Sequence, residues 1–114
     1  MDHIFEVSDK TGRKIHLSKE RWRHIRRKHP EIENSEYIQE TIEKPDKITN
    51  IHSDQTIYYF WKYYKNRSES DKFLLVVVKY LNEYAYVISA YYEDKIKWKN
   101  QQLMKSTMMK KETF

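Results

Sequence analysis

The five consecutive apolar residues Leu74–Val78 constrain the fold of this chain more than any other stretch. A half-buried strand alternates apolar and polar side chains, whereas a strand covered on both faces is apolar at every position. This stretch therefore predicts a central strand of a sheet, within a longer strand over residues 72–81. A second strand is predicted over residues 84–92, joined to the first by a turn at Asn82-Glu83.

The register of these two strands decides which side chains share a face. With a regular two-residue turn, Ser89 and Tyr91 share a face with Val76 and Val78. A one-residue bulge would swap the faces.

The remaining patterns complete an α+β fold. The other predicted elements are strands over residues 4–7, 14–17, 47–51 and 56–64, a helix from the N-cap Ser18 to Pro30, and a second helix within residues 32–43. A turn sequence at residues 8–12, which ends in the single glycine of the chain, predicts a hairpin from the first two strands. This order predicts an N-terminal hairpin and two helices packed on one face of a roughly four-stranded antiparallel sheet. The other face of the sheet is the expected working surface.

Length and charge divide the chain into one domain and an extension. A chain of 114 residues corresponds to a single domain. Residues 1–94 carry no net charge, whereas residues 95–114 contain six lysines and one glutamate. We therefore expect a folded domain over residues 1–94 and a basic C-terminal tail or helix over residues 95–114.

Several classes of chemistry are excluded by residues that the sequence lacks. Without cysteine there is no disulfide, no thiolate zinc site and no thiol nucleophile, and one glycine cannot make a glycine-rich phosphate loop. His3, His16 and His52 are scattered, and His24 and His29 are five apart, unlike the i, i+4 pair of a zinc helix. We therefore expect no metal and no cofactor. No apolar run approaches 18 residues and no signal peptide is recognisable, so we expect a soluble, cytoplasmic protein without membrane contact.

The first predicted helix is strongly basic. Trp22, Ile25 and His29 form a narrow apolar stripe. Around this stripe lie six cations and one acid: Lys19, Arg21, Arg23, Arg26, Arg27, Lys28 and Glu20. One interpretation is a solvated amphipathic helix, and the other is a site for a polyanion. The second is supported by His24 and Lys28, one turn apart, because a titratable imidazole beside fixed cations suits phosphate chemistry.

Several segments together resemble a known superfamily. They are F-E-V-S-D-K-T-G-R-K-I-H-L-S (5–18), W-R-H-I-R-R-K-H-P-E-I (22–32), T-I-E-K-P-D-K-I (41–48), F-L-L-V-V-V-K-Y (73–80) and Y-V-I-S-A-Y-Y (86–92). Over roughly residues 3–92 the chain resembles the phage-associated branch of the BECR-fold superfamily, which unites barnase, EndoU-type nucleases, anticodon-cleaving colicins and RelE-like toxins. The motifs H-I-x-x-x-H-P-E and V-I-S-A-Y are the most specific parts of this resemblance.

This resemblance implies a metal-independent endoribonuclease. In that superfamily the ribose 2′-hydroxyl attacks the adjacent phosphorus and leaves a 2′,3′-cyclic phosphate. Members act as toxins or as effectors in conflicts between phage and host, which implies RNA as substrate and an acidic antitoxin or immunity-type protein as partner. Active residues vary across the superfamily and some members have lost activity, so fold alone does not fix function.

The reaction needs a base, an acid and positive charge near the phosphate. His24 is the first candidate for proton transfer, and its alternative is an ordinary surface histidine. The other predicted catalytic residues are Lys28, Ser89 and Tyr91, where Ser89 touches the phosphate by resemblance and Tyr91 stacks on a base or donates to the phosphate. The predicted nucleic-acid contacts are Arg21, Arg23, Arg27, Lys28 and Tyr58.

Two alternatives of another class remain. One is an RNA-binding module of the same fold without catalysis, and it predicts salt-dependent binding of RNA that stays intact. The other is a protein-interaction domain in which residues 95–114 dock on an acidic partner. It predicts that deletion of residues 95–114 abolishes partner binding while the domain stays folded.

Overall fold

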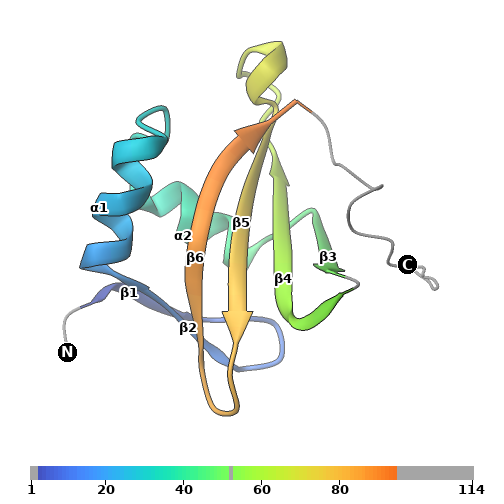
Figure 1. The fold of residues 1–114 in the computed structure, drawn as a ribbon. Coiled ribbons are helices and arrows are strands. Elements are labelled where there is room, and N and C mark those ends of the chain that lie inside the picture. Colours follow the sequence, from blue (N-terminus) through green and yellow to red (C-terminus); the bar gives the residue numbers. More distant parts are fainter. Residues whose placement is uncertain (1–2, 52, 95–114) are drawn as a thin grey trace.

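The computed structural model describes residues 3–51 and 53–94, which form an open six-stranded sheet with two α-helices (Figure 1). The elements are β1 (His3–Ser8), β2 (Lys14–Ser18), α1 (Lys19–Lys28), α2 (Ser35–Glu43), β3 (Lys47–Ile51), β4 (Asp54–Tyr63), the 3-10 turn η1 (Glu69–Asp71), β5 (Phe73–Tyr80) and β6 (Ala85–Glu93). The strand order is β1-β2-β6-β5-β4-β3. No described helix is long and apolar enough to cross a membrane.

The α+β class is confirmed, but the sheet is larger than predicted. We expected the hairpin to pack with the helices against four antiparallel strands. Instead β2 pairs in parallel with β6 through Ile15–Ala85 and His16–Tyr86, so the hairpin extends the sheet to six strands and makes it mixed. A parallel pair between strands far apart in sequence has no connecting turn, and so it leaves no local sequence signal.

The predicted basic tail or helix over residues 95–114 lies outside the described residues. The division into a domain over residues 1–94 and an extension stays a prediction.

Side-chain caps begin both helices. The Ser18 hydroxyl oxygen accepts a hydrogen bond of 3.0 Å from the backbone N–H of Arg21 at the start of α1. The Asn34 side chain accepts one of 2.9 Å from the backbone N–H of Glu36 at the start of α2. Each bond satisfies a backbone donor that the helix itself leaves unpaired. The predicted N-cap Ser18 is therefore confirmed, and Asn34 caps the second helix.

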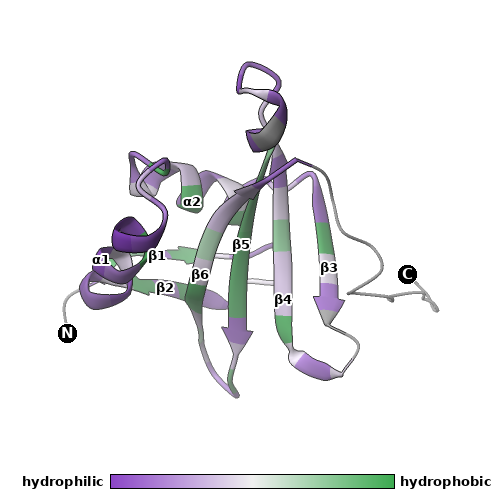
Figure 2. Ribbon diagram, turned by 45° about the horizontal axis from the view of Figure 1, so that its top comes forward, coloured by the Kyte–Doolittle hydropathy of each residue, from purple (hydrophilic) through white to green (hydrophobic). Residues whose placement is uncertain are grey.

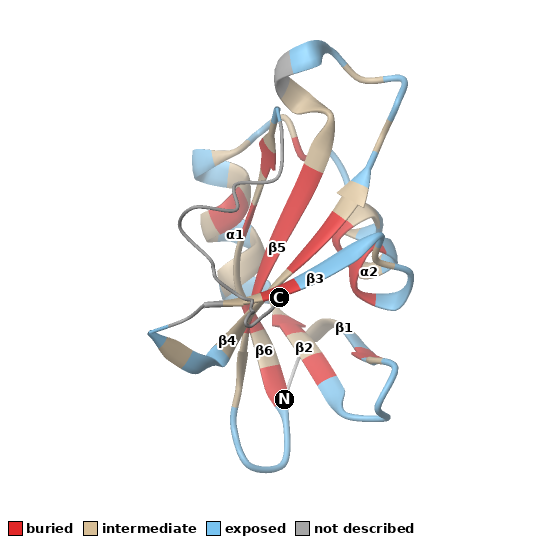
Figure 3. Ribbon diagram, turned by 90° about the vertical axis from the view of Figure 1, so that its right-hand side faces the viewer, coloured by how far each residue is buried: buried red, intermediate tan, exposed pale blue. Residues whose placement is uncertain are grey.

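β5 is buried on both faces, as its apolar run predicts (Figures 2 and 3). Leu74, Val76 and Val78 belong to the main core, which lies between the sheet and the two helices. The other members of that core include Ile15, Leu17, Ile25, Ile32, Ile38, Ile42, Phe60 and Val87. Leu75 and Val77 point to the opposite side, where they pack with Trp61 in a second cluster. We call this second side, away from the helices, the open face.

A β-bulge determines the direction of the β6 side chains. Val78 opposes Val87, but Val77 opposes Ser89, so Ile88 is an extra residue. Beyond the bulge, Ser89 and Tyr91 lie opposite Val77 and Leu75 and therefore on the open face. The prediction from a regular two-residue turn placed Ser89 and Tyr91 on the same face as Val76 and Val78. That prediction is wrong for the part of β6 beyond the bulge at Ile88.

Candidate active site

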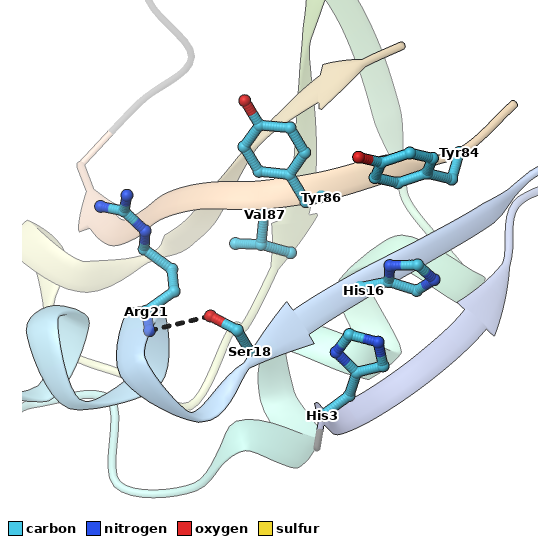
Figure 4. Close-up of a pocket in the computed structure, with 7 residues that line it drawn as sticks. All are labelled: His3, His16, Ser18, Arg21, Tyr84, Tyr86 and Val87. Atoms are coloured by element: carbon cyan, nitrogen blue, oxygen red, sulfur yellow. Dashed lines mark hydrogen bonds between the residues drawn. The ribbon is translucent and has the colours of Figure 1, made fainter. Parts of the chain in front are cut away.

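Two neighbouring pockets open where the hairpin meets α1 and β6. The first has a volume of about 380 Å³ and is lined by His3, His16, Ser18, Arg21, Tyr84, Tyr86 and Val87 (Figure 4). The second has a volume of about 240 Å³ and is lined by Ser18, Glu20, Arg21, His24 and Arg27. Because Ser18 and Arg21 line both pockets, we treat the two as one site and call it the α1 groove.

Three stacked rings form one wall of the α1 groove. The rings of His3 and His16 have centroids 4.3 Å apart and are inclined by 16°, and the Tyr84 ring follows at 5.5 Å from His16. The hairpin register places Glu6 opposite His16, and Oε2 of Glu6 lies 2.7 Å from Nε2 of His16. Nδ1 of His3 is buried and has no hydrogen-bond partner within the described residues. The wall thus combines an imidazole held by a carboxylate with one whose nitrogen is unsatisfied.

Basic side chains of α1 form the other side of the groove. Arg21, His24 and Lys28 recur at i, i+3 and i+7, so they lie along one side of the helix. No ion pair to these three residues is found in the described part of the chain. Partial desolvation, followed by the positive charges of Arg21, Lys28 and Arg27, lowers the pKa of His24 from its usual 6.5. His24 therefore remains a neutral proton acceptor at lower pH than an ordinary histidine.

α1 runs alongside β6 on the side of these basic residues. At the start of the helix, Arg21 lines the first pocket together with Tyr86. At its end, the His29 ring stacks on the Tyr91 ring, with centroids 5.4 Å apart and planes inclined by 28°. The two contacts place Arg21 and His29, near the two ends of the helix, beside the open face of β6.

One family model covers nearly all of this structure. The model described as phage-Barnase-EndoU-ColicinE5/D-RelE like nuclease2 matches residues 4–109. The chain belongs to this family. The match confirms the resemblance to the phage-associated branch of BECR-fold nucleases, and it includes every residue of the α1 groove except His3. No curated protein and no solved structure matches the chain.

The residues predicted for this nuclease from its sequence fall into two neighbouring sets. Arg21, His24 and Arg27 line the α1 groove, and Lys28 continues their side of the helix. Ser89 and Tyr91 lie on the open face of β6 and line neither pocket of the groove. The structure thus places the two sets on adjacent elements.

Two predicted nucleic-acid contacts lie elsewhere on the nuclease. Tyr58 opposes Val78 and packs on the main core, so it lies on the helix side of the sheet, away from Ser89 and Tyr91. Its ring meets the Tyr80 ring edge-on at 5.1 Å. Arg23 is exposed on α1 but lines neither pocket of the groove.

Sequence reasoning missed the histidine wall of the nuclease. His3 and His16 were expected to be scattered, yet they are stacked. The predicted hairpin contains a signal that could have found the contact between Glu6 and His16. Ser8 pairs with Lys14 across the turn, and the same register places Glu6 opposite His16. Tyr84 and Tyr86 reach the groove through the parallel pairing of β2 with β6, which has no local signal.

The side chains that line the α1 groove include imidazole, guanidinium and hydroxyl groups. Within residues 3–51 and 53–94, no group of three or more His, Asp or Glu side chains is arranged to hold a metal ion.

Proposed function

We propose that this nuclease is a metal-independent endoribonuclease that leaves 2′,3′-cyclic phosphate ends. The observation that carries the proposal is the α1 groove, in which Arg21 lines both pockets, with His16 in one and His24 in the other. A phosphodiester at Arg21 then has an imidazole on each side, one for each proton that moves in the reaction.

His24 acts as the base. Its lowered pKa keeps it neutral near pH 7, so it accepts the proton of the ribose 2′-hydroxyl. The 2′-oxygen forms a bond to the adjacent phosphorus, and the negative charge that develops on the phosphorane oxygens lies beside Arg21. The partial positive charge at the N-terminus of α1, where Ser18 caps the helix, adds to this stabilisation.

His16 acts as the acid. Glu6 holds the His16 ring through the contact at Nε2, which leaves Nδ1 for the substrate. As the bond between phosphorus and the 5′-oxygen breaks, His16 donates its proton to that oxygen. The products are a 2′,3′-cyclic phosphate and a free 5′-hydroxyl, and His24 and His16 have exchanged protonation states. Side chains carry both protons and the charge, so the scheme uses no metal.

The test is cleavage of an RNA octamer in EDTA, with end-group analysis, by the wild type, Arg21→Ala and Arg23→Ala. We expect cyclic phosphate ends from the wild type and about a 10²–10³-fold lower kcat/KM for Arg21→Ala, because a donor to the developing charge is lost. Arg23→Ala removes the same charge from the same helix outside the groove and should cleave like the wild type. Equal activity of both variants, or no cleavage by the wild type, would refute the proposal.

The biological role is proposed on separate grounds. We propose that the chain acts as a toxin or an effector in phage conflict, and that an acidic partner inhibits it by covering α1. The support is the family description, which names phage, colicin and RelE-like proteins, and the row of exposed cations Arg23, Arg27 and Lys28. Expression in a bacterial host should arrest growth for the wild type but not for Arg21→Ala, and equal arrest by both would contradict a toxin acting through this site.

A further inference from the structure

The open face of β6 continues from Tyr86, which lines the α1 groove, to side chains that have no part in the chemistry above yet suit nucleic acid. Tyr86 lies opposite Lys79, Ser89 opposite Val77 and Tyr91 opposite Leu75. All three face the same side because the bulge at Ile88 shifts the alternation by one residue. Tyr86 and Tyr91 are five residues apart, roughly 16 Å at about 3.3 Å per residue of strand.

The segment from Arg21 on α1 to its C-cap His29 has a similar length. Arg21 lies at the Tyr86 end and His29 at the Tyr91 end. These two helix positions are eight residues apart, roughly 12 Å at about 1.5 Å per residue. A basic helix, with Arg21 at the Tyr86 end, therefore runs beside a row of aromatic rings, and this combination suits the backbone of a single strand whose bases stack on the rings.

At the far end of this row, the rings of Tyr91 and His29 form a stacked pair, which we call the platform. The ring of Tyr91 packs on the second apolar cluster, which contains Trp61 and Leu75, and is stacked with His29. Burial raises the pKa of Tyr91, so its hydroxyl stays protonated as a donor. The Ser89 hydroxyl lies between Tyr86 and Tyr91 along the strand.

We propose that Tyr86, Ser89, Tyr91 and His29, which we call the β6 strip, bind nucleotides flanking the cleaved phosphodiester, so that the substrate is an unpaired RNA segment longer than a dinucleotide. A base stacks on the platform of Tyr91 and His29, and Ser89 donates a hydrogen bond to the intervening backbone. A dinucleotide whose phosphate lies at Arg21 does not reach Tyr91. A duplex is a poor ligand, because its bases are already paired and stacked on one another. The inference rests on the proposed function.

The test measures binding without cleavage. Oligonucleotides with 2′-O-methyl riboses lack the attacking hydroxyl, so they report affinity alone. Fluorescence anisotropy at one fixed salt concentration gives Kd for a dinucleotide, a single-stranded octamer and the same octamer in a duplex. The variants are Tyr91→Leu, which keeps apolar cover on the second cluster but removes the aromatic face, and Tyr91→Phe, which keeps the ring. Tyr63→Leu is the matched control, because Tyr63 is 47% exposed on β4, away from β6.

We expect Tyr91→Leu to bind the octamer about tenfold more weakly, because one base loses its aromatic platform. Its affinity for the dinucleotide should be unchanged, and Tyr91→Phe and Tyr63→Leu should bind both ligands like the wild type. An undiminished affinity of Tyr91→Leu for the octamer would overturn the inference. The same holds for an equal loss with the dinucleotide, or for a duplex that binds the wild type as tightly as the single strand.

The same variants separate this inference from the proposed function. Octamer binding that depends on Tyr91, in a protein that cleaves no RNA, would refute the nuclease chemistry and retain the β6 strip. Cleavage of an RNA octamer and a dinucleotide by Tyr91→Leu at wild-type kcat/KM would retain the chemistry and refute the strip.

Discussion

Two clusters of this protein contain the same kinds of side chains but differ in how their polar atoms are satisfied. The first, which we call the Asp9 cluster, consists of Asp9, Arg13, Tyr58 and Tyr80 near the turn of the hairpin. The Tyr80 hydroxyl donates to Oδ2 of Asp9 at 2.6 Å, and the Arg13 guanidinium lies 5.0 Å from the centre of the Tyr80 ring. The other Asp9 oxygen accepts hydrogen bonds from the backbone N–H groups of Thr11 and Arg13.

The α1 groove also combines aromatic, cationic and acidic side chains, but its polar atoms are only partly paired. Glu6 holds one nitrogen of His16, whereas Nδ1 of His3 is buried without a partner. Within the described residues, Arg21 and His24 form no ion pair. Polar groups satisfied by one another stabilise a fold, whereas charged or titratable side chains that line a pocket without an ion-pair partner are available to a ligand. The comparison therefore predicts a role in stability for the Asp9 cluster and is consistent with the activity proposed for the α1 groove.

The largest expected effect comes from the two imidazoles of the groove. His16→Ala and His24→Ala should each lower kcat/KM for RNA by about 10²–10⁴, the usual contribution of a positioned acid or base. The unfolding curve of His24→Ala in urea should stay close to that of the wild type, because His24 lies outside the core. His16→Ala also loses two ring contacts and the contact with Glu6, so its activity is compared at temperatures where it is folded. If His24→Ala lost stability as well as activity, the α1 groove would not differ from the Asp9 cluster in the way that we infer.

Asp9→Ala should give the opposite result. It leaves Tyr80 without its acceptor and removes the side-chain acceptor of the hairpin turn, so we expect a loss of about 1–3 kcal/mol in the free energy of unfolding. At temperatures where the variant is folded, its kcat/KM should match that of the wild type. Tyr80→Phe is the companion variant, because it removes the other partner of the same bond. Lower activity of a folded Asp9→Ala protein would place this cluster in the site.

The pH dependence of stability follows from the same residue. Partial burial opposes ionisation of Asp9, but the hydrogen bonds from Tyr80 and Thr11 outweigh it and hold the pKa of Asp9 below its usual 3.8. A lowered pKa means that this stabilisation is present above about pH 4 and is lost as the pH falls through the folded-state pKa. Urea titrations at several pH values should show that the free energy of unfolding falls less steeply in acid for Asp9→Asn than for the wild type. An equal fall in both proteins would mean that Asp9 does not cause this pH dependence.

The smallest effect concerns the protonation of His24. Its pKa is lowered by partial desolvation and by neighbouring cations, so the acidic limb of kcat/KM against pH should lie below 6.5. Lys28→Gln removes one of these charges, which raises the pKa of His24 and moves the acidic limb to higher pH. Arg23→Gln should leave the limb in place. A limb that does not move in Lys28→Gln would mean that another group titrates.

The local elements of this fold could be predicted from the sequence, whereas the contacts between distant elements could not. Ser18 as a cap, the apolar run Leu74–Val78 and the hairpin turn are local signals, and each appears as expected. The parallel pair of β2 with β6 and the bulge at Ile88 depend on packing across the whole sheet. Those two features bring Tyr86 beside His16 and turn Ser89 to the open face.

The candidate site shows the same division. Arg21, His24 and Arg27 were found because they lie close together on one helix. His3 and His16 are thirteen positions apart in the numbering and meet only through the β1–β2 register. Tyr58 was grouped with the site by residue type, and only the strand register shows that it lies on the other side of the sheet.

The most direct test of the central claim compares two substrates with different leaving groups. RNA needs a proton on its departing 5′-oxygen, whereas a nucleoside 3′-(4-nitrophenyl phosphate) has a leaving group that departs unprotonated. If His16 is the acid and His24 the base on either side of Arg21, His16→Ala should cleave the nitrophenyl ester at a rate near that of the wild type while it fails on RNA. His24→Ala should be slow on both substrates. Wild-type cleavage of RNA by either variant, or a His16→Ala protein that is equally slow on both substrates, would contradict the account.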